Sequence, residues 1–224
     1  MDKEQVKIVA ITGNIGSGKS AVAKLIANQG YFVISSDETA KELINSDVSL
    51  QEKLKRTFGD DLFDSEGKQD KGRFREILFG KGGKSNRVKM DSIIHPAVLA
   101  DNFERIEKYI ETEDGRDIVF VESALAFESG MAEGCDYVVQ VSCPPEIADK
   151  RLTDGRGLGI ETIEAIRATQ LSEQEKEKLA DFTINNSSTL EALEKSVGFI
   201  LPILESLPVK FGREEEEEED KLLD

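Results

Sequence analysis

The segment from residue 13 to residue 20 has a pattern that binds phosphate groups. It reads Gly13-Asn14-Ile15-Gly16-Ser17-Gly18-Lys19-Ser20 and fits G-x-x-x-x-G-K-[ST]. Glycines let successive backbone N–H groups turn toward one anion, and a helix that starts here adds partial positive charge. Lys19 can reach the β- and γ-phosphates, and the Ser20 hydroxyl can be a ligand of the Mg²⁺ that bridges them. The segment predicts nucleoside triphosphate binding, and the flanking elements disfavour a chance glycine-rich turn.

Asp37 is the first candidate for acid–base chemistry. It follows an apolar run directly, in Ile34-Ser35-Ser36-Asp37. The ends of adjacent parallel strands meet at one crevice, so the carboxylate could face the γ-phosphate and orient an acceptor hydroxyl. Asp is also preferred before the first turn of a helix, and Asp37 could instead cap a helix over Glu38–Ile44. Spacing alone does not separate these two hypotheses.

A second cluster bears on the type of reaction. A GTPase is expected to carry an Asn-Lys-x-Asp guanine reader, and no such tetrapeptide occurs. The segment from Lys150 to Gly159 joins basic side chains to three glycines. It could close over ATP as a lid and bring arginines to the transferred phosphoryl group, as a kinase needs. It could also be an ordinary helix end with a Gly stop. Next to a phosphate-binding segment, the lid is favoured.

The elements that must position these residues alternate between short apolar runs and amphipathic stretches. This alternation is typical of an α/β fold with a parallel sheet. The predicted strands are Val6–Thr12, Tyr31–Ile34, Ile118–Val121, Tyr137–Val141 and Phe182–Ile184. The predicted helices of this part are Ser20–Asn28, Ile160–Lys178 and Leu190–Glu205, and Pro208 marks the end of the fold.

Between Glu38 and about Arg116 no strong strand signal occurs. Apolar residues have helical spacing instead, at Leu50–Phe58, Arg73–Phe79 and Val98–Glu111. The segment Lys81-Gly82-Gly83-Lys84-Ser85 has the composition of a flexible connector. These features predict a helical insertion in an otherwise α/β domain.

The composition excludes several classes of protein. A chain of 224 residues fits one domain with a modest insertion, and its net charge of -16 argues against a general nucleic-acid binder. No apolar run of about 18 residues is present, so no membrane span is expected. The start, Met1 to Gln5, lacks the apolar stretch of a signal peptide. Cys135 and Cys143 provide no disulfide framework, which predicts a reducing, cytoplasmic location.

The last residues account for much of the negative charge. Glu214–Glu219, Asp220 and Asp224 outweigh Arg213 and Lys221, giving a charge of -6 from eight acidic and two basic residues. Acidic runs of this kind are typical of solvated, disordered ends. Residues 209–224 are therefore predicted to be an acidic, disordered tail.

Further short motifs follow in order along residues 6–204. They are Ile8–Ser20, Val33–Asp37, Phe58-Gly59, Leu62–Gly67, Arg73 with Ile77-Leu78-Phe79, Ile93-Ile94-His95-Pro96, Leu125–Glu128, Arg151-Leu152 with Arg156, Gln170-Leu171-Ser172, Ala180-Asp181 and Asn185-Asn186. Each later motif is weak alone, but their order and spacing together resemble the dephospho-coenzyme A (dephospho-CoA) kinase family.

The resemblance implies a P-loop NTPase three-layer α/β fold with a parallel sheet. The kinase core would comprise residues 1–37 and 117–208, with a lid at about 150–160 and a helical, acceptor-binding insertion at 38–116. The implied reaction transfers the γ-phosphate of ATP, with Mg²⁺, to the ribose 3′-hydroxyl of dephospho-CoA. Its products are CoA and ADP, and it is the last step of CoA biosynthesis. The expected partners are ATP and dephospho-CoA, and the oligomeric state stays open.

The resemblance also implies roles for individual residues. Asp37 would accept or orient the hydroxyl proton, with Lys19 and Arg156 as further catalytic groups and Arg167 as a weaker candidate. Ser20 would bind the metal. The acceptor would contact Asp37, His95 and Arg73, although His95, the single histidine, could equally be structural. ATP would be bound by Gly13, Asn14, Ile15, Gly16, Ser17, Gly18, Lys19, Ser20, Ala21 and Arg151.

The chain departs from the family pattern at several positions. Ala21 stands where the family usually has Thr, which removes one hydroxyl contact toward the α-phosphate. Ser35-Ser36-Asp37 replaces the usual Asp-Ala-Asp, Ser123–Glu128 dilutes a Pro-Leu-Leu-Phe-Glu stretch, and Arg156 is displaced by one position. Glu122 could touch Mg²⁺ through water or be a structural acid. Two alternatives therefore stay open: another P-loop small-molecule kinase, or a nucleotide-binding regulatory homologue without transfer activity.

Overall fold

A five-stranded parallel sheet lies at the centre of the molecule. The computed structural model describes residues 6–112 and 117–210. The strands are β1 (Lys7–Thr12), β2 (Phe32–Ser35), β3 (Ile118–Glu122), β4 (Tyr137–Ser142) and β5 (Phe182–Asn185). Their order in the sheet is β2-β3-β1-β4-β5, and every neighbouring pair is parallel. The prediction of an α/β fold with a parallel sheet is confirmed, with strand bounds within about two residues of those expected.

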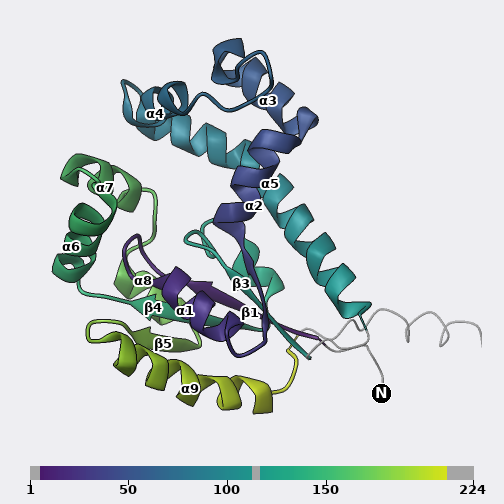
Figure 1. Cartoon of the computed structure of the whole chain (residues 1–224), viewed down its shortest axis with the longest axis vertical. Helices are drawn as coiled ribbons and strands as arrows, with labels where there is room; N and C mark the ends of the chain where they lie inside the picture. The colour runs from purple at the N-terminus through teal and green to yellow at the C-terminus, as the bar shows by residue number, and fades with distance from the viewer. Residues whose placement is uncertain (1–5, 113–116, 211–224) are drawn as a thin grey trace, which may run out of the picture.

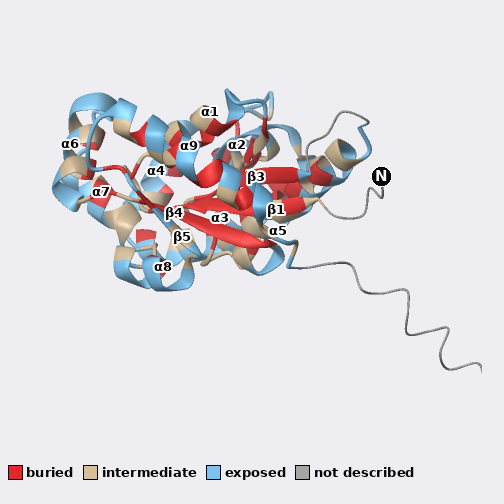
Figure 2. Cartoon of the chain, turned by 90° about the horizontal axis from the view of Figure 1, so that it is seen from below, coloured by how far each residue is buried: buried red, intermediate tan, exposed pale blue. Residues whose placement is uncertain are grey.

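Helices cover both faces of this sheet and form three layers (Figure 1). The helices of this part are α1 (Lys19–Ala27), α6 (Pro145–Arg156), α7 (Ile160–Arg167), α8 (Glu173–Leu179) and α9 (Leu190–Ser206). Buried residues of α1 and α9, such as Val22 and Val197, pack with Val9 and Ile11 of β1. The edge strands β2 and β5 are only partly buried, whereas the central strands β3, β1 and β4 are buried along most of their length (Figure 2). Burial on both faces explains why they read as continuous apolar runs.

Within residues 36–112, which follow β2, the chain forms four helices before it reaches β3. They are α2 (Ser36–Ser46), α3 (Val48–Phe58), α4 (Lys71–Phe79) and α5 (Gly83–Ile110), with a short 3₁₀ helix at Asp60–Leu62. They have a core of their own, which includes Leu54, Leu62, Phe74 and Ile94. The last turns of α5 reach the sheet, where Ile106 packs in a separate core with residues of β1 and β3. The long helix α5 therefore joins this helical insertion to the sheet (Figure 1).

The helix α5 begins earlier than predicted. The expected helix over Val98–Glu111 starts at Gly83, so the predicted flexible connector at 81–85 lies partly inside it. Met90, Ile94 and Val98 are four residues apart and buried, and this burial outweighs the hydrogen bond that Pro96 removes from the helix interior. The Asn86 side-chain amide also donates to the Ile77 carbonyl oxygen at 3.0 Å, which joins α5 to α4.

The predicted single helix over Ile160–Lys178 is wrong. It is two helices, α7 and α8, and the chain between them is not helical. Ser172 starts α8 with a capping box: its hydroxyl accepts from the Glu175 N–H, and the Glu175 carboxylate accepts from the Ser172 N–H. The Ser-x-x-Glu spacing is a sequence signal for a helix start.

In residues 6–112 and 117–210, no helix is both long and apolar enough to cross a membrane, as the sequence predicted. The predicted acidic tail begins at Val209, and its part from residue 211 onward lies outside the described residues. The helix α9 ends at Ser206, just before Pro208.

Candidate active site

The predicted phosphate-binding segment, residues 13–20, forms the turn between β1 and α1. Gly13, Gly16 and Gly18 have φ angles of 147°, 80° and 97°, which L-residues with a side chain rarely adopt. At Gly18 a Cβ atom would lie 2.0 Å from Asn186 Nδ2, so a larger residue would strain the backbone and displace the Asn186 side chain. Among the residues that the structure describes, no side chain caps the N-terminus of α1. The start of this helix is therefore suited to an anionic ligand.

Two polar side chains from distant parts of the chain hold this phosphate loop. The Ile15 N–H donates to Gln170 Oε1 at 3.0 Å, and Asn186 Nδ2 donates to the Ser17 carbonyl oxygen at 2.8 Å. Gln170 follows α7, and Asn186 follows β5. The loop is therefore positioned by the two segments that lie beyond the predicted lid and the last strand.

Lys19 is 7% exposed and lies at the first position of α1. Its Nζ donates to the Asn14 carbonyl oxygen at 3.4 Å. Burial lowers the pKa of Lys19, while the nearby carboxylates of Glu122 and Asp37 act in the opposite direction. The ammonium group thus lies between the loop and two acids from neighbouring strand ends.

Glu122 ends β3 and is 2% exposed. Its Oε1 accepts from the Ser20 hydroxyl at 3.4 Å, and its Oε2 accepts from the Ser35 hydroxyl at 2.9 Å. Burial raises the pKa of Glu122, and the positive charge of Lys19 opposes this shift. Ser35, which stands where the resemblance expects an acid, therefore supports Glu122 instead.

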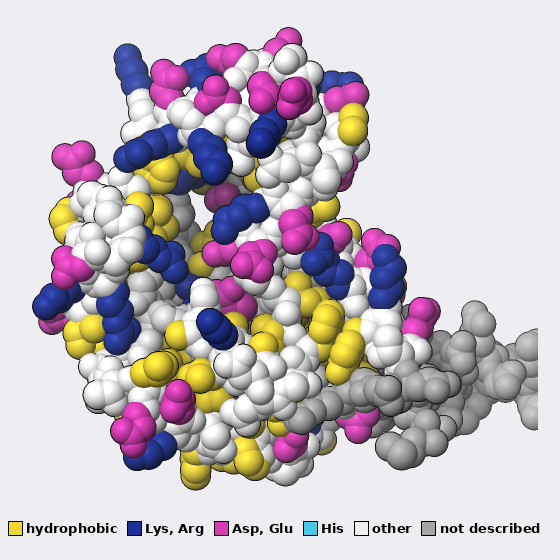
Figure 3. Space-filling view, viewed as in Figure 1, with side chains coloured by type: hydrophobic (Ala, Val, Ile, Leu, Met, Phe, Trp, Pro, Cys, Tyr) yellow, Lys and Arg dark blue, Asp and Glu magenta, His cyan; other side chains and the backbone are white. Residues whose placement is uncertain are grey.

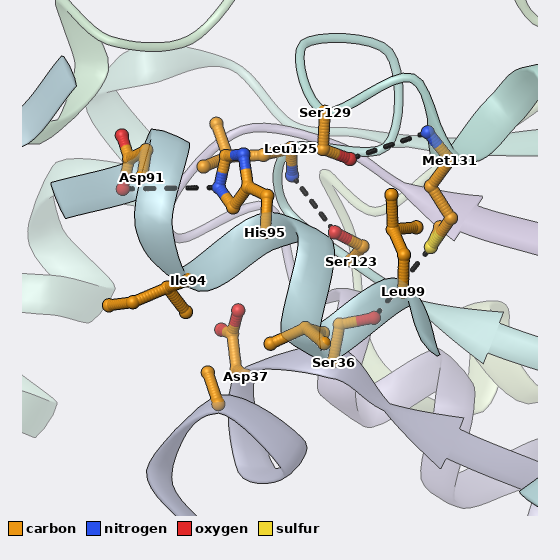
Figure 4. Close-up of a pocket in the computed structure, with 12 residues that line it drawn as sticks. Ser36, Asp37, Asp91, Ile94, His95, Leu99, Ser123, Leu125, Ser129 and Met131 are labelled. Atoms are coloured by element: carbon orange, nitrogen blue, oxygen red, sulfur yellow. Dashed lines mark hydrogen bonds and ion pairs between the residues drawn. The ribbon is translucent and has the colours of Figure 1, made fainter. Parts of the chain in front are cut away.

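Asp37 lies in the first turn of α2 and is not the cap of that helix. The cap position is Ser35, and no side chain makes a cap hydrogen bond there, so the capping hypothesis is wrong. The carboxylate of Asp37 points instead into a cavity of about 180 Å³ (Figure 4). The charge of Asp37 also acts on Lys19.

The cavity lies between α2, α5 and the segment after β3. It is lined by Ser36, Asp37, Ala40, Asp91, Ile94, His95, Val98, Leu99, Ser123, Leu125, Ser129 and Met131. His95 Nε2 is 3.9 Å from Asp91 Oδ1, one helical turn earlier in α5 (Figure 4). Burial raises the pKa of Asp91, and His95 opposes this shift. His95 and Asp37 are both predicted to contact the acceptor, and both line this cavity.

The two arginines that were predicted to contact ATP or the transferred phosphoryl group, Arg151 and Arg156, lie outside this cavity. A Cβ at Gly18 would lie 3.9 Å from Arg151 Nη1, so Arg151 is beside the phosphate loop. Arg156 ends α6 and is exposed, and its charge contributes to lowering the pKa of Lys19. Gly157 terminates α6 in a left-handed conformation, as the helix-end interpretation requires. In Figure 3, Lys and Arg side chains surround a hollow between α6–α7 and the helical insertion.

Two other arginines have local partners. Arg167 forms an ion pair with Asp149 across α6 and α7. Arg73 pairs with Asp61 at 2.8 Å and with Glu76 at 2.7 Å, and it is not among the residues that line the cavity. Of the predicted acceptor residues, the structure thus brings together Asp37 and His95 but not Arg73.

Comparison with known proteins identifies this arrangement. A family model described as dephospho-CoA kinase matches residues 7–192. The chain belongs to the dephospho-CoA kinase family. Its activity is dephospho-CoA kinase activity, a phosphotransfer and the final step of CoA biosynthesis.

A curated relative and two solved structures are similar to this chain over most of its length. A dephospho-CoA kinase from Fusobacterium nucleatum is 35% identical over 192 residues, which cover 86% of this chain and 95% of the relative. A crystal structure from Thermus thermophilus has a TM-score of 0.72 at 30% identity and covers 89% of this chain and 98% of its own. The dephospho-CoA kinase from Campylobacter jejuni has a TM-score of 0.63 at 26% identity, covering 88% and 96%.

One buried charge, that of Lys176, was not predicted from the sequence. Lys176 of α8 is 0% exposed, and its Nζ lies 3.0 Å from Glu128 Oε1. Lys176 belongs to a run of charged residues, Glu173 to Lys178, which reads as a solvated helix face. Its burial could not be recognised from this run, because the other charged residues of the run are not buried.

Proposed function

We propose that ATP and dephospho-CoA meet where the phosphate loop and the cavity at Asp37 adjoin. The observation that carries this proposal is the position of Asp37, which lines the cavity while its charge acts on Lys19 of the loop. A carboxylate that is close to both substrates can hold the acceptor hydroxyl in position to attack the γ-phosphate. The chain would act in a reducing cytoplasm, which suits its two free, buried cysteines.

In this proposal ATP is held by the backbone N–H groups of residues 13–21. Lys19 neutralises the β- and γ-phosphates, and Arg151 lies beside the loop to contact the polyphosphate. Backbone N–H groups at the start of α1 replace the hydroxyl that Ala21 lacks. Residues at about 150–160 act as the lid, and Arg156 stabilises the negative charge that is spread over the phosphoryl group during transfer.

The residues near Lys19 fit a magnesium ion. Mg²⁺ prefers hard oxygen ligands and keeps several waters, so it needs only one or two protein ligands besides phosphate oxygens. Ser20 and Glu122 offer such oxygens 3.4 Å apart. Within residues 6–112 and 117–210, no group of three or more His, Cys, Asp or Glu could hold a metal by itself. Bound Mg²⁺ would supply positive charge to the β- and γ-phosphates.

Asp37 acts as the general base. Its carboxylate accepts the proton of the ribose 3′-hydroxyl as the oxygen forms its bond to the γ-phosphorus. The bond between this phosphorus and the β–γ bridging oxygen breaks, and ADP leaves. The insertion at 38–116 holds the rest of dephospho-CoA, with His95 in the cavity and Arg73 on the outer helices.

The test is a coupled ADP-release assay with Mg-ATP and a panel of acceptors. The proposal expects ADP with dephospho-CoA and a rate at least about a hundredfold lower with nucleosides or sugar alcohols. Faster ADP release with another acceptor would make the chain a different small-molecule kinase. ATP binding without ADP release in the presence of any acceptor would make it a regulatory homologue.

A further inference from the structure

One wall of the cavity is an irregular segment that needs support from elsewhere. Residues 123–130 follow β3 as a series of turns without a helix or strand. Ser123, Leu125 and Ser129 of this segment line the cavity (Figure 4). A wall built from turns keeps its shape only if other groups fix its backbone.

Lys176 fixes this wall from the side of α8. Its Nζ donates to the Ala124 carbonyl oxygen at 2.6 Å and pairs with Glu128 Oε1 at 3.0 Å. The side chain of Lys176 is 0% exposed, and that of Glu128 is 15% exposed. Burial lowers the pKa of Lys176, and Glu128 opposes this shift. Since a buried ammonium is unfavourable without partners, its position is tied closely to these two groups.

The same carboxylate connects the wall to the phosphate loop. Glu128 Oε1 also accepts from the Leu171 N–H at 2.7 Å. The preceding residue, Gln170, accepts from the Ile15 N–H of the loop at 3.0 Å. The charge of Lys176 also acts on Lys19 and helps to lower its pKa. A short chain of contacts therefore connects the cavity wall at residues 123–130 to the phosphate loop.

We propose that Lys176 is a positioning residue for phosphoryl transfer. Together with Glu128 it fixes residues 123–130 relative to the phosphate loop, so that the acceptor hydroxyl lies in line with the γ-phosphate. The inference rests on the proposed function, because that function assigns the cavity to the acceptor.

The pair could instead serve only to stabilise the fold. A buried ion pair can often be replaced by uncharged groups without loss of stability, whereas removing one partner alone leaves an unpaired charge. The informative variant therefore removes both charges, as Lys176→Met with Glu128→Gln, and keeps an acceptor oxygen for the Leu171 N–H. Lys178→Met is the matched control, because Lys178 is an exposed lysine of the same helix.

The experiment measures kcat and KM for dephospho-CoA, the Kd of ATP by calorimetry, and the thermal midpoint. Rates are normalised to the fraction of protein that binds ATP. We expect the double variant to lose about 10- to 100-fold in kcat/KM for dephospho-CoA, because small misplacements of an acceptor have effects of this size. Its ATP Kd should stay within about threefold of wild type, and Lys178→Met should match wild type within about twofold.

Residual kcat/KM within about threefold of wild type in the double variant would overturn the inference. So would an equal loss of ATP affinity and acceptor kcat/KM, which indicates general loosening of the fold. If the double variant does not fold, Lys176→Arg is measured instead, because it keeps both charges of the pair but changes the geometry of the contacts to Ala124 and Glu128, and the same split between ATP and acceptor is expected. Failure of the proposed function is distinct, because the wild type itself would then release no ADP with dephospho-CoA.

Discussion

Replacing Asp37 by asparagine isolates its role as a base. The change keeps the size of the side chain and removes the group that takes the hydroxyl proton. General bases contribute about 10²- to 10⁴-fold to rate, so kcat should fall by that factor. This loss corresponds to about 2.7–5.4 kcal/mol of activation free energy. ATP should bind as tightly as before or more tightly, since a negative charge near Lys19 and the phosphates is lost.

The structure also limits how much stability Asp37→Asn can remove. Asp37 is not the cap of α2, so the change affects mainly its favourable interaction with the helix dipole, about 0.3–1 kcal/mol. In a chain of this size that corresponds to a thermal midpoint lower by at most about 4 °C. The loss of turnover should therefore far exceed any loss of folded protein.

The assay combines steady-state ADP release, calorimetry with ATP and thermal unfolding. Glu38→Gln is the matched control, because Glu38 is an exposed acid in the same first turn and does not line the cavity. It should share the small stability change and keep wild-type kcat. The base assignment is refuted if Asp37→Asn keeps kcat within about threefold of wild type, or if Glu38→Gln loses as much.

Four further changes test the rest of the site. Lys19→Met should weaken ATP binding at least about tenfold and lower kcat by about 10²-fold or more, measured by calorimetry and ADP release; wild-type affinity would contradict its role. Arg156→Ala should lower kcat by about 10- to 1,000-fold with little change in KM for dephospho-CoA, and wild-type turnover would remove it from the mechanism. Gly18→Ala should abolish calorimetric ATP binding in a folded chain, because its Cβ would lie 2.0 Å from Asn186 Nδ2; tight binding would show that the loop adapts. Burial raises the pKa of Glu122 above 4.5, so the native carboxyl keeps its proton to a higher pH than the unfolded one, and the wild type loses stability as pH rises through that window. Urea unfolding should therefore show that the free energy of unfolding of Glu122→Gln, relative to that of the wild type, is higher at pH 8 than at pH 5. The same difference at both pH values would contradict this.

The central features of the fold could be predicted because their signals are local. The apolar run of β1, the glycines of the phosphate loop and the amphipathic α1 lie next to one another in the sequence, so the site of phosphate binding follows from residues 6–28. Asp37 could be chosen as a candidate for the same reason, because it lies just after a strand. Its alternative as a helix cap needed coordinates, since both roles place an Asp at the end of a strand and the start of a helix.

Contacts between distant segments were beyond the sequence. The chain leaves the helical path after Arg167 and turns so that Gln170 meets Ile15, 155 positions earlier. Nothing local to Gln170 indicates that contact, although the capping box at Ser172 could have shown where α8 begins. Lys176 reads as one more exposed charge, and its burial is explained by two partners from residues 123–130, the Ala124 carbonyl oxygen and the Glu128 carboxylate. Arg73, in contrast, has ion-pair partners close to it in the sequence, Asp61 and Glu76, which belong to the same helical insertion.

The most direct measurement is the position of the transferred phosphate. The chain is incubated with Mg-ATP and dephospho-CoA, and the products are separated and examined by ³¹P NMR and mass spectrometry. We expect equal amounts of ADP and a product phosphorylated on the ribose 3′-hydroxyl, identical to CoA. A phosphate on any other atom of the acceptor, or no phosphorylated acceptor while ATP is bound, would contradict the placement of Asp37 and the phosphate loop around that hydroxyl.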